Sequence, residues 1–77
     1  MNAAEKLKDI FRRVLQVDDI DDTTSPETVP AWDSFNALTI VSEIEKGFKI
    51  NFTLDEVTAM RTVADIRKVL KKKGVAL

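Results

Sequence analysis

The chain has 77 residues, of which 44% are apolar and 32% are charged, and its formal net charge is −1. This length suits one domain, residues 1–77, around a single hydrophobic core, and the composition excludes both a disordered tail and a membrane protein. Cysteine, histidine and tyrosine are absent. The sequence therefore lacks a disulfide framework, a thiolate metal site and the commonest general base, and it disfavours an enzyme.

The charges are unevenly distributed along the sequence. Six acids and no bases lie between Asp18 and Asp33, whereas six bases opposed only by Asp65 lie between Arg61 and Lys73. A nucleic-acid-binding domain is expected to be basic overall, so we expect no nucleic-acid partner. The first residues lack the basic-then-apolar order of a signal peptide, and no apolar run is long enough for a membrane span. We expect a cytoplasmic monomer.

The first 30 residues predict a helix followed by a long loop. Apolar residues at helical spacing predict an amphipathic helix from about Asn2 to Gln16. The periodicity fails from Val17 to Pro30, which predicts an ordered loop. Four aspartates of this loop could suggest calcium, but the glycine and glutamate of a calcium-binding loop are missing from their expected positions. We interpret them as a solvated acidic cluster.

A second helical pattern begins at Asp33. Its apolar stripe reaches Phe48, and we expect Gly47 to loosen its end. The residues from Phe48 to Phe52 alternate between apolar and polar side chains, but the segment is too short to indicate a strand. We interpret them as a connector whose apolar side chains pack into the core.

Two more helices are predicted from capping signals. Thr53 and Glu56 have the spacing of a capping box and predict a short helix that ends near Met60. Thr62 offers a similar start for a last helix that ends near Gly74. The predicted fold class is therefore all-α, a small four-helix bundle with three longer helices, one short helix and a long loop between the first two.

The start of the second predicted helix is suited to hold a phosphate. Asp33 is a good N-cap residue, and Ser34 follows it in the first helical turn. Unpaired backbone N–H groups and the positive end of the helix dipole favour a covalently attached phosphate at this position. The alternative is an ordinary serine at a helix start. Trp32, just before the cap, is interpreted as a loop anchor over one end of the core.

The sequence from this point resembles the acyl carrier protein family. The resemblance rests on three segments, which are Asp33-Ser34-Phe35, Ala37-Leu38-Thr39-Ile40-Val41 and Glu43-Ile44-Glu45-Lys46-Gly47-Phe48-Lys49-Ile50. In that family an Asp-Ser-Leu motif opens the second of four helices, and a transferase moves phosphopantetheine from coenzyme A onto the serine. The resemblance extends over nearly the whole chain.

The resemblance implies a role for each residue of the motif. Ser34 would carry a covalent 4′-phosphopantetheine arm, and Asp33 would cap the helix and contribute to recognition by the transferase. The implied partners are a phosphopantetheinyl transferase and acyl-transferring, acyl-activating or condensing enzymes. The carrier itself would perform no catalysis.

Phe35 departs from the family pattern, because it takes the place of the usual leucine. On an ideal helix it lies opposite the apolar stripe, so we expect it to be exposed and to serve as a docking contact together with Asn36, Thr39 and Glu43. A partly buried Phe35 is the alternative. This outer face is only weakly charged here, whereas it is strongly acidic in many family members, which suggests a specialised pathway.

The predicted function is that of an acyl carrier protein in fatty-acid, polyketide or specialised lipid biosynthesis. One alternative is a peptidyl or aminoacyl carrier of a nonribosomal-type pathway, which differs in cargo. Another is a helical adaptor that is never modified, in which Ser34 is only structural. The sequence also leaves open whether the apolar stripe shelters an acyl chain or only packs.

Overall fold

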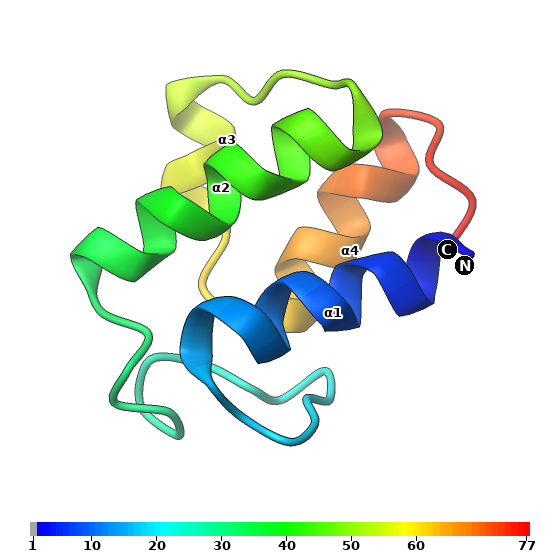
Figure 1. Ribbon diagram of the computed structural model, residues 1–77. Helices are drawn as coiled ribbons and strands as arrows, with labels where there is room; N and C mark the ends of the chain where they lie inside the picture. Colours follow the sequence, from blue (N-terminus) through cyan, green and yellow to red (C-terminus); the bar gives the residue numbers. More distant parts are fainter. Residues whose placement is uncertain (1) are drawn as a thin grey trace.

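A computed structural model describes residues 2–77 of the chain. Four helices are present, namely α1 (Ala3–Leu15), α2 (Ser34–Phe48), α3 (Leu54–Ala59) and α4 (Val63–Lys72). No strand occurs within residues 2–77. Figure 1 shows how the long loop returns from the end of α1 to the start of α2, with α3 and α4 behind α2. The all-α, four-helix prediction is confirmed.

The ends of α1 differ from the prediction by one residue each. The Asn2 side chain accepts a hydrogen bond from the Glu5 backbone N–H at 2.8 Å, so Asn2 caps the helix rather than belonging to it. At the other end Gln16 has a φ of 56°, in the left-handed region, and the last helical residue is Leu15. Both terminal residues of the predicted range are therefore caps.

Gly47 lies inside α2, one residue before its end. The helix continues to Phe48 and is capped by Lys49, whose φ of 55° is left-handed. The last turn is held against α1, because the Lys6 ammonium donates to the Gly47 carbonyl at 2.8 Å. In the connector that follows, the Phe52 N–H donates to a Glu45 carboxylate oxygen at 2.9 Å.

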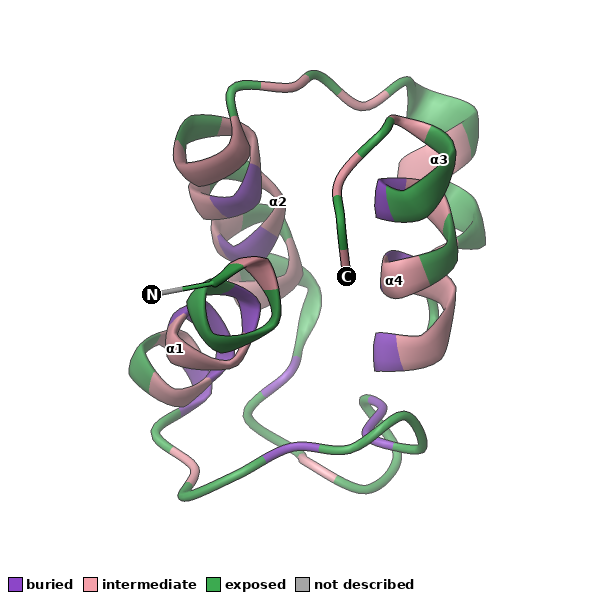
Figure 2. Cartoon of the chain, turned by 90° about the vertical axis from the view of Figure 1, so that its right-hand side faces the viewer, coloured by how far each residue is buried: buried purple, intermediate pink, exposed green. Residues whose placement is uncertain are grey.

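The hydrophobic core lies between α1, α2 and α4. Figure 2 shows the buried residues on the sides of these helices that face one another. Helix α3 contributes no fully buried residue, and only its Glu56 and Val57 are half-buried. The core consists of Leu7, Ile10, Phe11, Leu15, Ile20, Trp32, Ile40, Ile44, Val63, Ile66 and Leu70.

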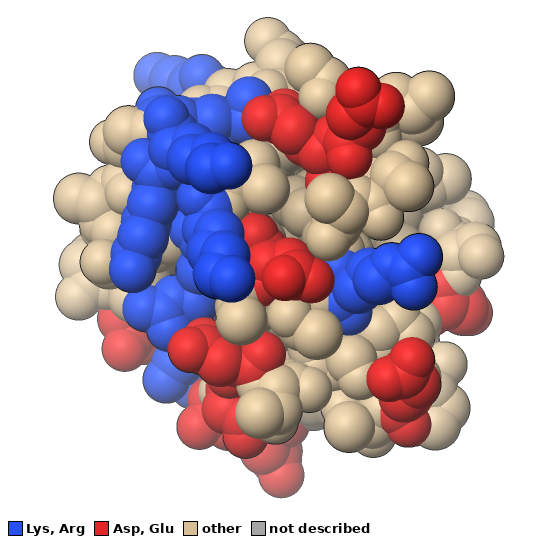
Figure 3. All heavy atoms as spheres, turned by 180° about the vertical axis from the view of Figure 1, so that it is seen from behind, with Lys and Arg blue, Asp and Glu red and all other residues tan. Residues whose placement is uncertain are grey.

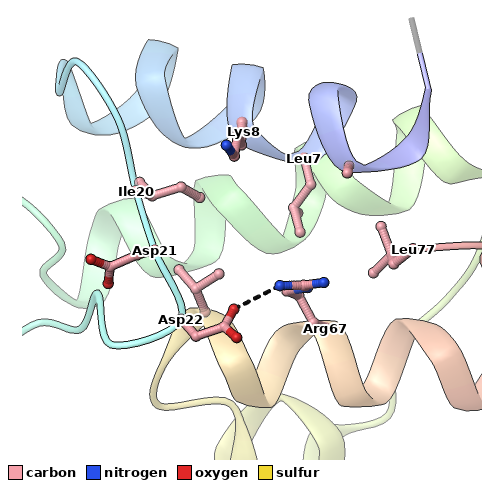
Figure 4. Close-up of a pocket in the computed structure, with 9 residues that line it drawn as sticks. Leu7, Lys8, Ile20, Asp21, Asp22, Arg67 and Leu77 are labelled. Atoms are coloured by element: carbon pink, nitrogen blue, oxygen red, sulfur yellow. Dashed lines mark hydrogen bonds and ion pairs between the residues drawn. The ribbon is translucent and has the colours of Figure 1, made fainter.

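The long loop is bound to the start of α4. The Val63 N–H donates to the Thr24 carbonyl at 3.1 Å, and the Ala64 N–H donates to the Asp22 carbonyl at 3.2 Å. Arg67 of α4 forms an ion pair with Asp22 at 2.8 Å, beside a cavity of about 270 Å³ (Figure 4). The first N–H groups of a helix have no acceptor within the helix, so the loop carbonyls serve as acceptors for those of α4.

The acidic part of the loop is held by intramolecular contacts. Asp19 lies 3.8 Å from the Lys8 ammonium and 3.6 Å from the Arg12 guanidinium. The pKa of the Asp19 carboxyl is lowered, mainly by the hydrogen bond from the Ile20 N–H and to a smaller extent by these two cations. Within residues 2–77, no group of three or more side chains is arranged to hold a metal ion.

Basic residues gather along one edge of the molecule. Figure 3 shows, from behind, a band of Lys and Arg side chains at this edge, with acidic side chains on the rest of the view. Lys68, Lys71 and Lys72 of α4 are all exposed. None of the helices in residues 2–77 is long and apolar enough to cross a membrane.

Trp32 fixes the end of the loop from which α2 begins. It is only 4% exposed, and its ring meets that of Phe11 edge to face, with the ring centroids 5.2 Å apart and the planes at 68°. The Trp32 N–H donates to the Val29 carbonyl at 2.9 Å. The interpretation of Trp32 as a loop anchor is confirmed.

We predict that Trp32→Ala lowers the free energy of unfolding by about 3 to 5 kcal/mol, because it removes a buried aromatic side chain and leaves a cavity. The matched control is Phe35→Ala, three residues away, where the ring is 75% exposed. This control should change the free energy of unfolding by less than about 0.5 kcal/mol. Urea unfolding followed by far-ultraviolet circular dichroism measures both. Equal losses in the two variants would contradict the anchoring role.

Candidate functional site

Ser34 is the first residue of α2, and it is exposed. Asp33 caps the helix in two ways. Its carboxylate accepts from the Asn36 N–H at 2.9 Å, and its carbonyl accepts from the Ala37 N–H at 2.8 Å. The cap leaves the N–H groups of Ser34 and Phe35 at the open end of the helix. The Ser34 hydroxyl is therefore accessible beside the positive end of the α2 dipole.

Asn36 stabilises the turn that leads into the site. Its side-chain amide donates to the Ala31 carbonyl at 2.6 Å and so spans residues 32–35, among them Ser34. Together with the buried ring of Trp32, this bond fixes the backbone on which the serine is carried. Asn36, which the sequence predicts for docking, is half-buried, and its amide group is bonded to Ala31.

A groove of about 410 Å³ begins at Ser34 and lies between the start of α2 and the turn that joins α3 to α4. Its lining consists of Pro26, Glu27, Trp32, Asp33, Ser34, Ala37, Met60 and Arg61. A smaller void of about 30 Å³ shares Trp32, Ala37 and Met60 with the groove and lies between it and the core. That void has about the volume of one water molecule, so it is too small for an acyl chain.

Phe35 is 75% exposed, which confirms the expected exposure and rules out the partly buried alternative. Leu38 is 64% exposed and stands one turn further along α2. Leu38 is not among the residues that the sequence predicts for docking. Its spacing, three residues after Phe35 and four after Ser34, was the signal that could have identified it.

The other two residues predicted for docking have intramolecular partners. The Thr39 hydroxyl donates to the Phe35 carbonyl one turn back, at 3.2 Å. Glu43 accepts from the Arg13 guanidinium of α1, at 3.3 Å. Both residues are half-buried. The exposed apolar surface beside Ser34 is therefore formed by Phe35 and Leu38.

The model of one protein family, described as the phosphopantetheine attachment site, matches residues 5–70. The chain belongs to this family. Its members are carrier proteins without catalytic activity, and the group that they carry is phosphopantetheine. The matched range contains α2, α3 and most of α1 and α4, so the whole groove lies inside it.

Two solved structures resemble this carrier protein. A holo acyl carrier protein from Geobacter metallireducens is 31% identical, with a TM-score of 0.83, and the match covers 95% of this chain and 86% of the other. A candidate acyl carrier protein from Mycobacterium tuberculosis is 20% identical, with a TM-score of 0.81, and the match covers 90% and 95%. The second comparison supports the fold alone. The curated protein sequences contain no significant match.

The residues at the start of α2 fit a phosphodiester. Ser34 offers an exposed hydroxyl, and the adjacent backbone N–H groups and helix dipole favour an anion. The groove beside it is large enough to receive part of a flexible arm. Since cysteine is absent from the chain, any thiol that the protein uses must be part of an attached group.

We predict that Asp33→Ala lowers the free energy of unfolding by about 1 kcal/mol, because the Asn36 N–H loses its acceptor. Asp33→Asn is the control, since an asparagine oxygen can still cap the helix. Urea unfolding of the unmodified protein compares the two. If Asp33→Asn loses as much stability as Asp33→Ala, the role of the side chain as a cap is wrong.

Proposed function

We propose that Ser34 is the attachment point of the phosphopantetheine arm, and that the protein carries acyl groups as thioesters on the terminal thiol of this arm. The observation that carries the proposal is the exposed Ser34 hydroxyl at the capped start of α2, inside the range that matches the family. Asp33 lines the same groove, where a transferase could contact it. The arm raises the local concentration of its cargo at each partner's active site.

The modification is a phosphoryl transfer in which Ser34 Oγ is the nucleophile. A bond forms between Ser34 Oγ and the β-phosphorus of coenzyme A, and the bond from that phosphorus to the bridging oxygen breaks. Adenosine bisphosphate leaves, and the serine proton passes to a base of the transferase. A phosphodiester on Ser34 remains. The carrier contributes the accessible hydroxyl and the field of the α2 N-terminus.

We propose acyl intermediates of fatty-acid, polyketide or specialised lipid biosynthesis as the cargo. The support is the likeness to the acyl carrier protein of Geobacter metallireducens, which extends over 95% of this chain. The partners are then a phosphopantetheinyl transferase and enzymes that activate, transfer or condense acyl groups.

We predict that purified protein incubated with coenzyme A, magnesium and a broad-specificity phosphopantetheinyl transferase gains the mass of one phosphopantetheine. Ser34→Ala should gain none. Ser42→Ala is the matched control, because Ser42 is an exposed serine of the same helix, and it should be modified like the wild type. Intact-mass spectrometry measures all three. A gain that persists in Ser34→Ala, or no gain with several transferases, would overturn the assignment.

We also propose that partner enzymes dock on the exposed apolar pair formed by Phe35 and Leu38. Both side chains stand on the first turns of α2, next to the proposed attachment point, so an enzyme that reaches the arm close to Ser34 would cover them. Burial of exposed apolar surface favours association, and aromatic side chains are enriched among the residues that contribute most to binding.

We predict that Phe35→Ala and Leu38→Ala each raise the KM of the transferase for the carrier about fivefold, the effect of roughly 1 kcal/mol of lost binding energy. Leu54→Ala is the control, because Leu54 is 80% exposed but belongs to α3. Steady-state kinetics with varied carrier concentration measure the three variants. An unchanged KM for both α2 variants, or an equal rise for Leu54→Ala, would contradict the docking face.

A further inference from the structure

Arg61 is a basic residue brought to the proposed attachment site by the fold. It lies in the turn between α3 and α4, far from Ser34 in sequence, yet both line the same groove. The ion pairs found within residues 2–77 do not include the Arg61 guanidinium. Arg61 is exposed, and it is one of the residues that line the open groove.

The backbone of Arg61 is held firmly although its side chain is exposed. The N–H groups of Arg61 and Thr62 both donate to one carboxylate oxygen of Asp65, at 3.0 and 3.2 Å. Thr62 in turn accepts from the Asp65 N–H at 3.2 Å and completes the capping box of α4. The Arg61 side chain, which lines the groove, is therefore attached to a backbone that is held in place.

The residues that line the groove carry more negative than positive charge. Glu27 and Asp33 are the acidic residues of its lining, and Arg61 is the basic one. A phosphodiester on Ser34 would add a further negative charge, one residue away from the Asp33 carboxylate. The dipole of α2 offsets only part of this repulsion, because Asp33 already occupies the helix end. A guanidinium offsets the remaining repulsion, because it carries a positive charge and can donate two parallel N–H groups to phosphate oxygens.

We propose that Arg61 binds the phosphate of the arm on Ser34 and so positions the first part of the arm along the groove between α2 and the α3–α4 turn. This inference rests on the proposed attachment to Ser34. Arg61 is a positioning residue, and the contact would restrict the directions in which the arm leaves the surface. Because the pair is electrostatic and exposed, salt should weaken it.

Phosphorus-31 NMR of the modified protein tests the proposal. In Arg61→Gln the phosphodiester resonance should move from its wild-type position toward that of a phosphopantetheinyl-serine peptide. In Arg61→Lys the resonance should lie between those of the wild type and Arg61→Gln. Lys68→Gln is the matched control, because it removes one positive charge from an exposed position of α4 that does not line the groove. Its spectrum should match the wild type. Raising the salt concentration should move the wild-type resonance in the same direction as Arg61→Gln.

A second readout follows the arginine itself. Conversion from the unmodified to the modified protein should shift the Arg61 Nε–H signal in a nitrogen-15 spectrum, whereas the signal of Arg67 should stay in place because it is paired with Asp22. Identical phosphorus spectra for the wild type and Arg61→Gln, with no shift of the Arg61 signal, would overturn this inference alone. If the wild type shows no phosphodiester resonance after treatment with several transferases, both this inference and the attachment to Ser34 are overturned.

Discussion

The packing of Trp32 against Phe11 is the contact on which the position of the site depends. Trp32 is buried in the core, yet only Asp33 separates it from the exposed Ser34. The buried ring therefore holds the backbone just before α2, and the Asp33 cap and the Asn36 side chain set how the helix starts from that point. The exposed Ser34 is in this way carried by a backbone that is held on both sides.

The opposite wall of the groove depends on the long loop. The carbonyls of Asp22 and Thr24 satisfy the first N–H groups of α4, and the start of α4 in turn fixes the turn that carries Arg61. Both walls are thus joined to one small core by packing and hydrogen bonds. A carrier protein needs little more, because the reactive thiol comes with the arm and the chemistry is done by its partners. What this chain supplies is an accessible hydroxyl, a charge environment and an apolar surface beside it.

Local sequence signals were enough to predict the four helices, the N-caps of the last three and the family. Capping and apolar periodicity act over three or four residues, so the roles of Asp33, Thr53 and Thr62 could be predicted without knowing how the helices pack. The exposure of Phe35 followed from the same periodicity. The importance of Ser34 came from its place at a helix start together with the resemblance to acyl carrier proteins, since local chemistry alone left an ordinary serine as an alternative.

The surroundings of that serine depend on how the helices pack together. Arg61 and Ser34 line one groove because α3 and α4 fold back beside the start of α2, and no local pattern encodes such an approach. The same holds for Glu43, which the sequence assigned to docking but which contacts Arg13 across the packed pair α1 and α2. Contacts of this kind depend on the angles and distances at which whole helices pack. These angles and distances are set by the packing of the complete core. The sequence patterns, in contrast, describe each helix separately.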